Sequence, residues 1–254
     1  MDLGLQGKNV FVTGASRGIG LRIARIFAEE GANIAFCARH AEGVDATAAE
    51  LEQKGVEVVG HVADLGGDGT SLKQAIEASA QKLGGLDILV QNVSAMAVGP
   101  TEADWEKSFQ TDILGTIRSV DACLPYLEQS TAAAIVVVGT TAAISGTGGP
   151  QPYGAMKAGL LHYVSGLAHS LAAKQIRANT VSPSSVYFEG GVWHRVKEHM
   201  PERFEQTIAR NPSGRMATPE EVAKAVVYLA SPCASFITGV NLVVDGGLTQ
   251  RVQF

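Results

Sequence analysis

Short apolar runs alternate with longer stretches of helical periodicity along the whole chain. The first run, Asn9–Thr13, predicts a strand, and apolar residues recur at helical spacing over Ile19–Glu30. Further strands are predicted at Ile34–Ala38, Val56–Val62, Leu86–Val90, Ile135–Val138, Ile176–Val181 and Val240–Val244. Helical stretches separate these runs, and glycine or proline occupies most of the joints. The pattern predicts about seven strands connected by helices.

Several predicted strands are apolar on both faces, which is typical of strands covered by helices on both sides. Strands joined by crossover helices form a parallel, doubly wound sheet. No linker, charge block or short repeat interrupts the alternation. We therefore predict an α/β fold with one Rossmann-type domain over residues 1–254. The stretch of about 187–214 lies outside the alternation, and we expect it to form two short helices that act as a substrate lid.

Composition narrows the functional classes. Hydrophobic residues make up 46% of the chain, which is enough for a large core, and the net charge is −5. This charge does not suit binding to nucleic acid or to an anionic membrane, so we expect neither partner. Residues Met1–Asn9 contain no apolar signal core and Ala132–Val138 is too short to cross a bilayer, which predicts a cytoplasmic protein.

Cysteine and histidine spacing argues against a metal site. Three cysteines, Cys37, Cys123 and Cys233, lie far apart in apolar stretches, and we expect reduced, packed thiols. The six histidines show no ligand spacing with acids or cysteines. We predict that the protein binds no metal.

A glycine-rich loop follows the first strand directly and opens a helix. Its residues are Thr13, Gly14, Ala15, Ser16, Arg17, Gly18, Ile19 and Gly20. Such a turn lets the backbone approach a pyrophosphate, whose charge then faces the N–H groups at the helix start. The spacing G-x-x-x-G-x-G differs from the commoner G-x-G-x-x-G. Three turn glycines without a ligand are the alternative, and the strand before and helix after favour a nucleotide.

The end of the second strand indicates which nucleotide binds. An acidic residue there would bind a ribose 2′-hydroxyl, but Phe36–His40 contains none and Arg39 lies at the turn. Arg17 could converge on the same place, and two guanidiniums suit a 2′-phosphate. NADP(H) is therefore favoured over NAD(H), with two solvated arginines as the alternative. Asp64, before Leu65, could accept from the adenine amino group or cap a helix.

Tyr153 and Lys157 lie four residues apart, on one face of a predicted helix. A nearby lysine favours a phenolate, and lowering a phenol's pKa by about 3 units takes roughly 4 kcal/mol. Thr140 ends the preceding strand, so its hydroxyl could hold a reacting oxygen beside the phenol. A surface Tyr–Lys pair is the alternative. The position favours a role in the site, because doubly wound sheets bind their ligands at the carboxyl ends of the strands, where Thr140 lies.

These motifs, in this order, resemble the short-chain dehydrogenase/reductase superfamily, and the resemblance runs nearly end to end. It is carried by the loop Thr13–Gly20, Leu86–Val90, Tyr153 with Lys157, Ile176–Asn179 with Val181–Pro183, Gly214-Arg215, Pro219–Ala223, Ile237–Gly239 and Val244–Gly247. The resemblance implies that Tyr153 is the general acid/base, that Lys157 binds the nicotinamide ribose and that Thr140 orients the substrate. It implies a cofactor site formed by Gly14, Ser16, Arg17, Gly18, Ile19, Gly20, Arg39, Asp64, Leu65, Asn92, Tyr153, Lys157, Pro183 and Val186.

Three positions depart from the family pattern. Ser94 stands where the family has a glycine close to the cofactor. Asp112 replaces the asparagine that supports a proton-relay water, so it accepts hydrogen bonds but adds a negative charge near Lys157. Phe188 replaces a threonine that contacts the cofactor. These changes concern rate and cofactor geometry more than the type of reaction, and Asp112 stays among the predicted catalytic residues.

The sequence favours a ketone reductase or secondary-alcohol dehydrogenase that acts on a small apolar substrate. The predicted substrate pocket includes Thr141, Ser94, Phe188 and Trp193, although the two aromatic residues could instead pack the lid onto the body. Reduction of 3-oxoacyl groups on acyl carrier protein or coenzyme A is an alternative, but the joint Leu127–Ala132 lacks the positive charge that an acidic carrier would require. A nucleotide-binding sensor or scaffold with weak catalysis is a second alternative. Apolar and small residues along Asp104–Leu127 and Ala155–Ala173 favour a homotetramer.

Overall fold

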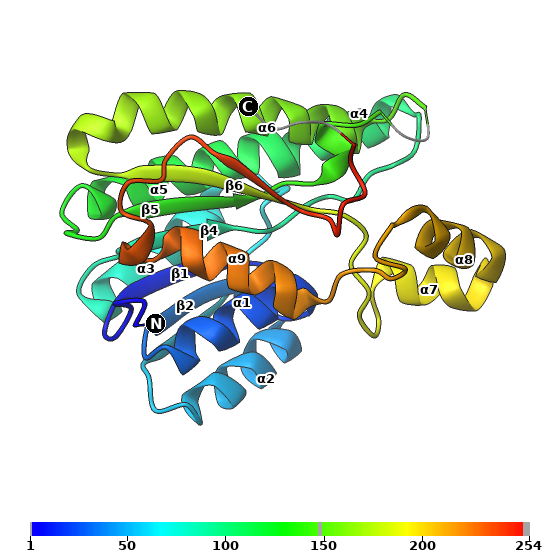
Figure 1. Cartoon of the computed structure of the whole chain (residues 1–254). Coiled ribbons are helices and arrows are strands. Elements are labelled where there is room, and N and C mark those ends of the chain that lie inside the picture. The colour runs from blue at the N-terminus through cyan, green and yellow to red at the C-terminus, as the bar shows by residue number, and fades with distance from the viewer. Residues whose placement is uncertain (1, 147–148, 251–254) are drawn as a thin grey trace.

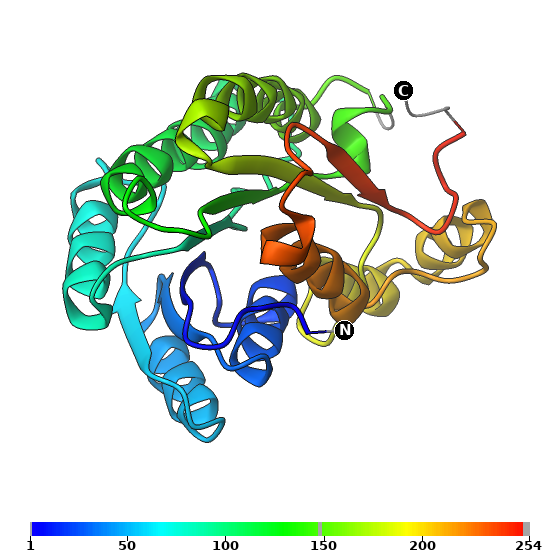
Figure 2. The ribbon, with the colours of Figure 1, turned by 60° about the vertical axis from the view of Figure 1, so that its left-hand side comes forward.

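The computed structural model describes residues 2–146 and 149–250, and this part of the chain contains one parallel sheet of seven strands (Figures 1 and 2). The strands are β1 (Asn9–Thr13), β2 (Asn33–Ala38), β3 (Val58–Val62), β4 (Ile88–Gln91), β5 (Ala134–Val138), β6 (Arg177–Pro183) and β7 (Asn241–Val244). Their order across the sheet is β3-β2-β1-β4-β5-β6-β7, and every pairing is parallel. The predicted doubly wound α/β sheet is confirmed.

Helices cover both faces of this sheet (Figure 1). One layer contains α1 (Gly18–Glu29), α2 (Ala41–Glu52) and α9 (Pro219–Ala230), and the other contains α3 (Thr70–Leu83), α5 (Gly115–Leu127) and α6 (Pro152–Leu171). Strand β5 explains why two layers are needed. Ala134, Val136 and Val138 belong to the first core, whereas Ile135 and Val137 belong to the second. An apolar strand of this kind is stable only when both of its faces are buried.

The strand order places the ligand crevice. Successive crossovers run outward in opposite directions from β1 and β4, and the carboxyl ends of these two strands form the topological switch point of the sheet. The glycine loop follows β1, and Asn92 follows β4. The sheet therefore brings the two segments together at the edge where doubly wound folds bind their ligands.

Two regions differ from a simple alternation of strand and helix. The predicted helical stretch Asp104–Leu127 consists of α4 (Glu102–Ser108), the π-helical turn η1 (Phe109–Leu114) and α5. The stretch 187–214 holds two short helices, as predicted: α7 (Val192–His199) and α8 (Pro201–Arg210). These two helices stand beyond the carboxyl edge of the sheet (Figure 1), around a small apolar cluster of their own. We call residues 187–214 the helical excursion.

Two sequence-based expectations need comment. Cys37 and Cys123 are buried, and burial raises the pKa of the Cys37 thiol to about 12, as suits an unreactive packed thiol. Cys233 is exposed, so the prediction of three packed thiols is wrong at this position, which lies in the surface turn η4 (Pro232–Ala234). Within residues 2–146 and 149–250, no helix is long and apolar enough to cross a membrane.

Arg177 connects the sheet to the end of helix α9. Its guanidinium donates to the carbonyl oxygens of Leu229, Ala230 and Ser231, the last two at 2.9 and 3.0 Å. These carbonyls lie at the C-terminus of the helix, where they have no partner within the helix and where the helix dipole favours a cation. A partly buried arginine therefore satisfies three acceptors at once.

We expect Arg177→Ala to lower the free energy of unfolding by about 2 kcal/mol, because it leaves buried carbonyl oxygens without donors. Urea denaturation followed by circular dichroism measures this change. Arg25→Ala is the matched control, since Arg25 pairs with Glu50 near the surface and such pairs contribute less than about 1 kcal/mol. Equal losses in the two variants would contradict the assigned role of Arg177.

Candidate active site

A single large cavity extends along the carboxyl edge of the sheet, from the glycine loop to the helical excursion. Its volume is about 2250 Å³. Pockets for one small ligand usually measure about 300–1,000 Å³. The cavity therefore has room for a dinucleotide together with a second, smaller molecule.

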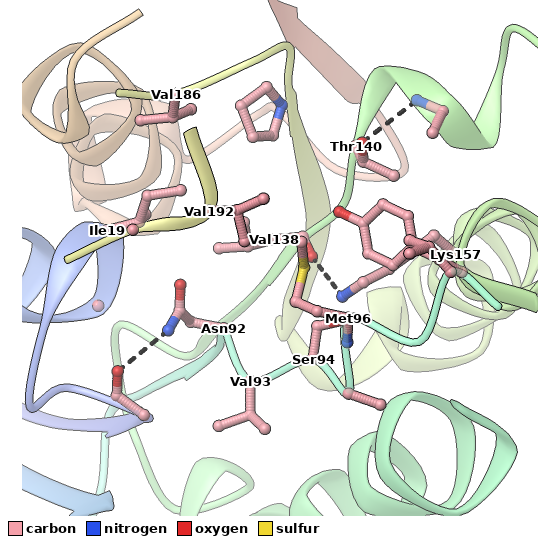
Figure 3. A pocket seen from close by; sticks show the side chains of 18 of the residues that line it. Ile19, Asn92, Val93, Ser94, Met96, Val138, Thr140, Lys157, Val186 and Val192 are labelled. Carbon is pink, nitrogen blue, oxygen red and sulfur yellow. Dashed lines mark hydrogen bonds between the residues drawn. The ribbon is translucent and has the colours of Figure 1, made fainter. Parts of the chain in front are cut away.

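The glycine loop is held in place by backbone contacts that side chains would prevent. Gly14 has a positive φ of 69°, and its N–H donates to the Cys37 carbonyl at 2.8 Å. A Cβ atom on Gly20 would lie 2.2 Å from the Gly14 carbonyl oxygen. Asn92 fastens the loop from the other strand, because its side-chain amide donates to the carbonyls of Thr13 and Gly14 at 3.1 and 3.2 Å. Figure 3 shows Asn92 with one of its hydrogen bonds.

Phe188 changes the middle of this loop. Gly18 has a φ of 56°, and a Cβ atom added there would lie 2.5 Å from the tip of the Phe188 ring. The ring therefore covers Gly18, which is absent from the described residues that line the cavity, whereas Gly14, Ser16, Arg17, Ile19 and Gly20 line it. Trp193 also lines the cavity but packs within the excursion's own cluster, near Phe204 and Met216.

Two arginines lie at the far end of the cavity, together with the carboxylates of Glu42 and Asp64. Arg17 and Arg39 both line it and are exposed, and neither forms an ion pair in the described part of the chain. Asp64 and Leu65 line the same end. The side chain of Asp64 accepts from Gly66 N at 3.1 Å, and helix α3 begins six residues after Asp64, at Thr70, with Gly69 at its N-cap. The alternative that Asp64 caps a helix is therefore wrong.

Thr140 and Tyr153 meet at the near end of the cavity. Thr140 follows β5, and its hydroxyl accepts from Ala142 N at 3.2 Å. Tyr153 is the second residue of α6, directly after Pro152, whose fixed φ suits a helix start. Burial raises the pKa of the Tyr153 phenol, a hydrogen bond with Thr140 offsets part of the rise, and the charge of Asp112 adds to it. Figure 3 shows Thr140 and Lys157 on either side of one ring.

Lys157 is buried beneath this pair, with an exposed fraction of 2%. Its ammonium donates to the Val138 carbonyl at 2.9 Å and lies 3.6 Å from Asp112 Oδ1. Burial lowers the pKa of Lys157, while Asp112 opposes that decrease. Burial is the largest cause of the raised pKa of the Tyr153 phenol, and the expectation that Lys157 favours the phenolate beside a bound oxidised nicotinamide stays a prediction.

Asp112 is completely buried and does not belong to the described residues that line the cavity. Its Oδ2 accepts from the Ser108 hydroxyl at 2.8 Å and from Ala95 N at 3.4 Å. It lies in the π-helical turn η1, and such turns are rare and concentrate at functional sites. Asp112 can therefore act on a reaction only through Lys157 and its surroundings, as a positioning residue. Ser108 and the η1 turn were not predicted, since nothing in the apolar periodicity marks them.

Ser94 reshapes the loop that follows β4. Its hydroxyl accepts from Met96 N at 3.1 Å, and Met96 adopts a φ of 51°, which is uncommon for a residue with a side chain. Met96 lines the cavity with its side chain 46% exposed (Figure 3). The sequence pointed to Ser94 but not to Met96, whose backbone conformation depends on the serine two residues before it.

A buried serine hydroxyl beside the cavity marks a place where a ligand could bind. Ser184 follows Pro183 and lines the cavity, and its buried hydroxyl has no partner among the residues that the structure describes. A buried polar group without a partner costs free energy, so such a group beside a cavity points to a ligand that binds it. Pro183, Val186, Thr141 and Asn92 line the same cavity, and their predicted roles in binding the cofactor or the substrate stay predictions.

Comparison with known proteins gives matches over nearly the whole chain. A family model described as enoyl-(acyl carrier protein) reductase matches residues 14–249. An isoepoxydon dehydrogenase of Penicillium expansum is 37% identical over 261 residues, covering 100% of this chain and 99% of that protein. A 3-oxoacyl-(acyl-carrier-protein) reductase of Thermotoga maritima is 32% identical over 249 residues, covering 96% and 98%. Among solved structures, a blue fluorescent protein from a metagenomic library, in complex with NADPH, has a TM-score of 0.87 at 31% identity, covering 97% and 99%.

The buried pair of Lys157 and Asp112 gives a prediction about stability. We expect Asp112→Asn to lower the free energy of unfolding by about 3 kcal/mol at pH 7, because it leaves a buried ammonium without its counter-charge. The pKa of Lys157 in the folded protein lies below its value of 10.5 in the unfolded chain. Between the folded and the unfolded pKa, the folded protein therefore binds fewer protons than the unfolded chain does. Stability therefore rises with pH in this window, and the loss caused by Asp112→Asn should shrink as pH approaches 10. Urea denaturation at pH 7 and 9.5 measures it.

A second substitution serves as the control for this prediction. Replacing Lys157 with Met in the Asp112→Asn background removes the isolated charge and should restore part of the lost stability. If the loss were the same at both pH values and the added Lys157→Met change restored nothing, the charge pair would not be its cause.

Proposed function

The chain belongs to the short-chain dehydrogenase/reductase family, and from this premise we propose that it is an NADP(H)-dependent oxidoreductase that interconverts a ketone and a secondary alcohol. One observation carries the proposal. Thr140, Tyr153 and Lys157 gather at one end of a cavity whose other end is the glycine loop after β1. The helical excursion at 187–214 borders the same cavity, and we propose that it acts as the substrate lid.

The dinucleotide site extends along the edge of the sheet. Gly14, Ser16, Ile19 and Gly20 would face the pyrophosphate, and Arg17 with Arg39 would bind the 2′-phosphate of NADP(H). Asp64 and Leu65 would border the adenine, while Asn92, Pro183, Ser184 and Val186 would border the nicotinamide half. A bound nicotinamide supplies or accepts the hydride. The NADPH bound to a structural neighbour supports a cofactor of this type.

The protein's own residues would handle the oxygen atom and its proton. Tyr153 would donate its phenolic proton to a carbonyl oxygen as the alcohol forms, and would accept that proton back in the reverse direction. The Thr140 hydroxyl would hold the same oxygen beside the phenol. Lys157 would place a fixed positive charge below them and would bind ribose hydroxyls, and Asp112 with Ser108 would keep that charge in position.

The pKa of Tyr153 bears on the direction of the reaction. Because its pKa lies above the ordinary value near 10, the phenol holds its proton at neutral pH. A protonated phenol is ready to serve as a general acid, which is the role that reduction of a ketone requires. Oxidation of an alcohol needs the phenolate and becomes efficient only in more alkaline solution. The raised pKa of Tyr153 therefore suits the proton-donating step of ketone reduction.

Reduction of carrier-bound 3-oxoacyl groups is the second candidate, favoured by the name of the Thermotoga maritima relative. The joint between α5 and β5 offers little for an acidic carrier. Glu128 lies at its start, paired at 2.5 Å with Lys174, so the nearby cation is already neutralised. A comparison of free and carrier-linked thioesters separates the two candidates.

The surface of the chain also suggests how copies assemble. Ala155, Gly159 and Gly166 are exposed along α6, and Leu242 is exposed on the edge strand β7. Small and apolar residues on a regular face permit close packing of a second copy. We therefore keep the homotetramer as a proposal.

We expect Tyr153→Phe to lower kcat for ketone reduction by roughly 10²- to 10⁴-fold, because the change removes the proton donor. The dissociation constant for NADPH, measured by fluorescence titration, should change little, since the ring remains. Tyr163→Phe is the matched control on the same helix, with a partly buried phenol that does not line the cavity. If Tyr153→Phe turned over ketones at the parent rate, the proposed role of Tyr153 would be excluded. If the parent protein itself turned over no ketone or alcohol in a broad screen, the alternative of a nucleotide-binding sensor or scaffold would be favoured.

Cofactor preference gives a separate prediction. We expect Arg39→Ala to raise the dissociation constant for NADPH about tenfold and to leave that for NADH nearly unchanged, because only the former carries a 2′-phosphate. Titrations with both nucleotides measure the ratio. Arg22→Ala, which removes an arginine paired with Glu220 away from the cavity, should not alter it. An equal loss for both nucleotides would contradict recognition of the 2′-phosphate by Arg39.

A further inference from the structure

Helix α8 presents two chemically different stripes. Phe204 and Ile208 pack into the apolar cluster that joins α8 to α7. Arg203, Gln206, Thr207 and Arg210 all line the cavity, and their spacing of i, i+3, i+4 and i+7 places them on one face of the helix. The helix therefore buries its apolar stripe against its neighbour and presents a polar stripe with two guanidiniums to the cavity that Tyr153 also lines.

The acidic residues of the helical excursion are sorted away from the cavity. Its carboxylates are those of Glu189, Glu198, Glu202 and Glu205, and none of them belongs to the described residues that line the cavity. Arg195 of α7 does line it, as a third guanidinium. Lys197, by contrast, lies over the rings of Tyr187 and Phe204. The excursion thus contributes three positive charges and no negative charge to the cavity wall.

These three arginines have no counter-charge from the protein. Arg22, Arg25 and Arg215 each pair with a glutamate, whereas Arg195, Arg203 and Arg210 form no ion pair in the part of the chain that the structure describes. Other carboxylates on the cavity wall are those of Glu42 and Asp64, at the adenine end, and Glu106, which has Lys107 beside it. The net charge of the wall around the excursion is therefore positive, although the whole chain carries −5.

The simplest explanation of the polar stripe is a helix face in contact with water. This explanation does not account for the separation of the acidic residues from the arginines on α8. A face in contact with water alone would tolerate acids and bases equally, and α8 has both. Its acids, however, lie off the cavity and its arginines on it. Guanidiniums bind carboxylates and phosphates through paired, charge-assisted hydrogen bonds. The arrangement therefore matches an anionic ligand.

Apolar side chains lie on the same wall as the reacting groups and the arginines. Met96 and Val98 from the loop after β4, and Val192 at the start of α7, all line the cavity and are 39–63% exposed. A substrate with its ketone at Tyr153 and an apolar middle would find a matching surface there. Its far end would meet the polar stripe of α8.

We propose that Arg203 and Arg210, assisted by Arg195, bind an anionic group of the substrate, a carboxylate or a phosphate, held apart from the reacting ketone by an apolar segment. This inference rests on the proposed function and refines it. The small apolar substrate expected from the sequence becomes an amphipathic, negatively charged one. The phosphates of the cofactor are the other possible source of negative charge, and the experiment has to separate them.

Binding can be measured without turnover in the Tyr153→Phe protein, saturated with NADPH, by isothermal titration calorimetry. The probes are matched pairs that differ in charge: 5-oxohexanoate and its methyl ester, 4-acetylbenzoate and its methyl ester, and the acetoacetyl thioesters of 4′-phosphopantetheine and of pantetheine. In at least one pair the anionic member should bind about tenfold or more tightly. Preference in the acid–ester pairs indicates a carboxylate, and preference in the thioester pair alone indicates a phosphate.

Arg203→Gln/Arg210→Gln in the same background should abolish this preference and leave the dissociation constant for NADPH unchanged. Glu205→Gln is the matched control, because Glu205 also lies on α8 but does not line the cavity. It raises the overall charge by one, but it should change neither the preference for the anionic probe nor the dissociation constant for NADPH. The inference is overturned if no pair shows a preference, if the preference survives the double substitution, or if NADPH binding weakens in its place. Failure of the parent protein to reduce any ketone would refute the proposed function, while these affinities would still decide the role of the arginines.

Discussion

Lys157 is almost fully buried at the wall of the cavity, and the arrangement of the site depends on how its ammonium group is held. The Val138 carbonyl and the Asp112 carboxylate are the groups that compensate it. Both come from elements that the sheet positions, the end of β5 and the π-helical turn η1. An ammonium that lost either partner would pay a large desolvation penalty or give up its proton. The ends of β5, η1 and α6 are therefore fixed relative to one another, and Thr140 and Tyr153 are fixed with them.

Much of the fold could be predicted from the apolar pattern, because burial on two faces leaves a strong signal. All seven strands lie where the runs of apolar residues predicted them, and the bounds differ by few residues. The third strand begins at Val58 and not at Val56, and the sixth continues to Pro183, where it pairs with Val244 of β7. Such ends are set by the neighbouring strand, and a pattern along one strand contains no information about its neighbour.

The site could be predicted where function requires a residue type at a fixed spacing, as for Gly14, Gly20, Tyr153 and Lys157. Spacing along the chain could not predict how one side chain changes the surroundings of another. Phe188 covers Gly18, so a glycine in the expected position does not reach the cavity. Burial raises the pKa of the Tyr153 phenol, and the charge of Asp112, which the fold brings near it, adds to the rise. Both effects arise from contacts between residues that are distant in sequence, and only the folded chain shows them.

The cavity is formed by two parts that are packed differently, the body of the fold and the helical excursion. The body carries the proposed reacting groups, and the excursion carries the residues proposed to select the substrate. Thr140, Lys157 and Asp112 are buried and joined to the two large cores of the body. The helical excursion packs around a small core formed by its own Val196 and Phe204 and by Met216, which follows it, with Tyr187, Trp193 and Ile208 packed around them. A segment with so few buried contacts opens at a lower free energy than the body does, which suits a lid. The cavity-facing stripe of α8 takes no part in that small core. Its residues could therefore change without disturbing either the fold or the proton donor, and the selectivity of the site can vary independently of its chemistry.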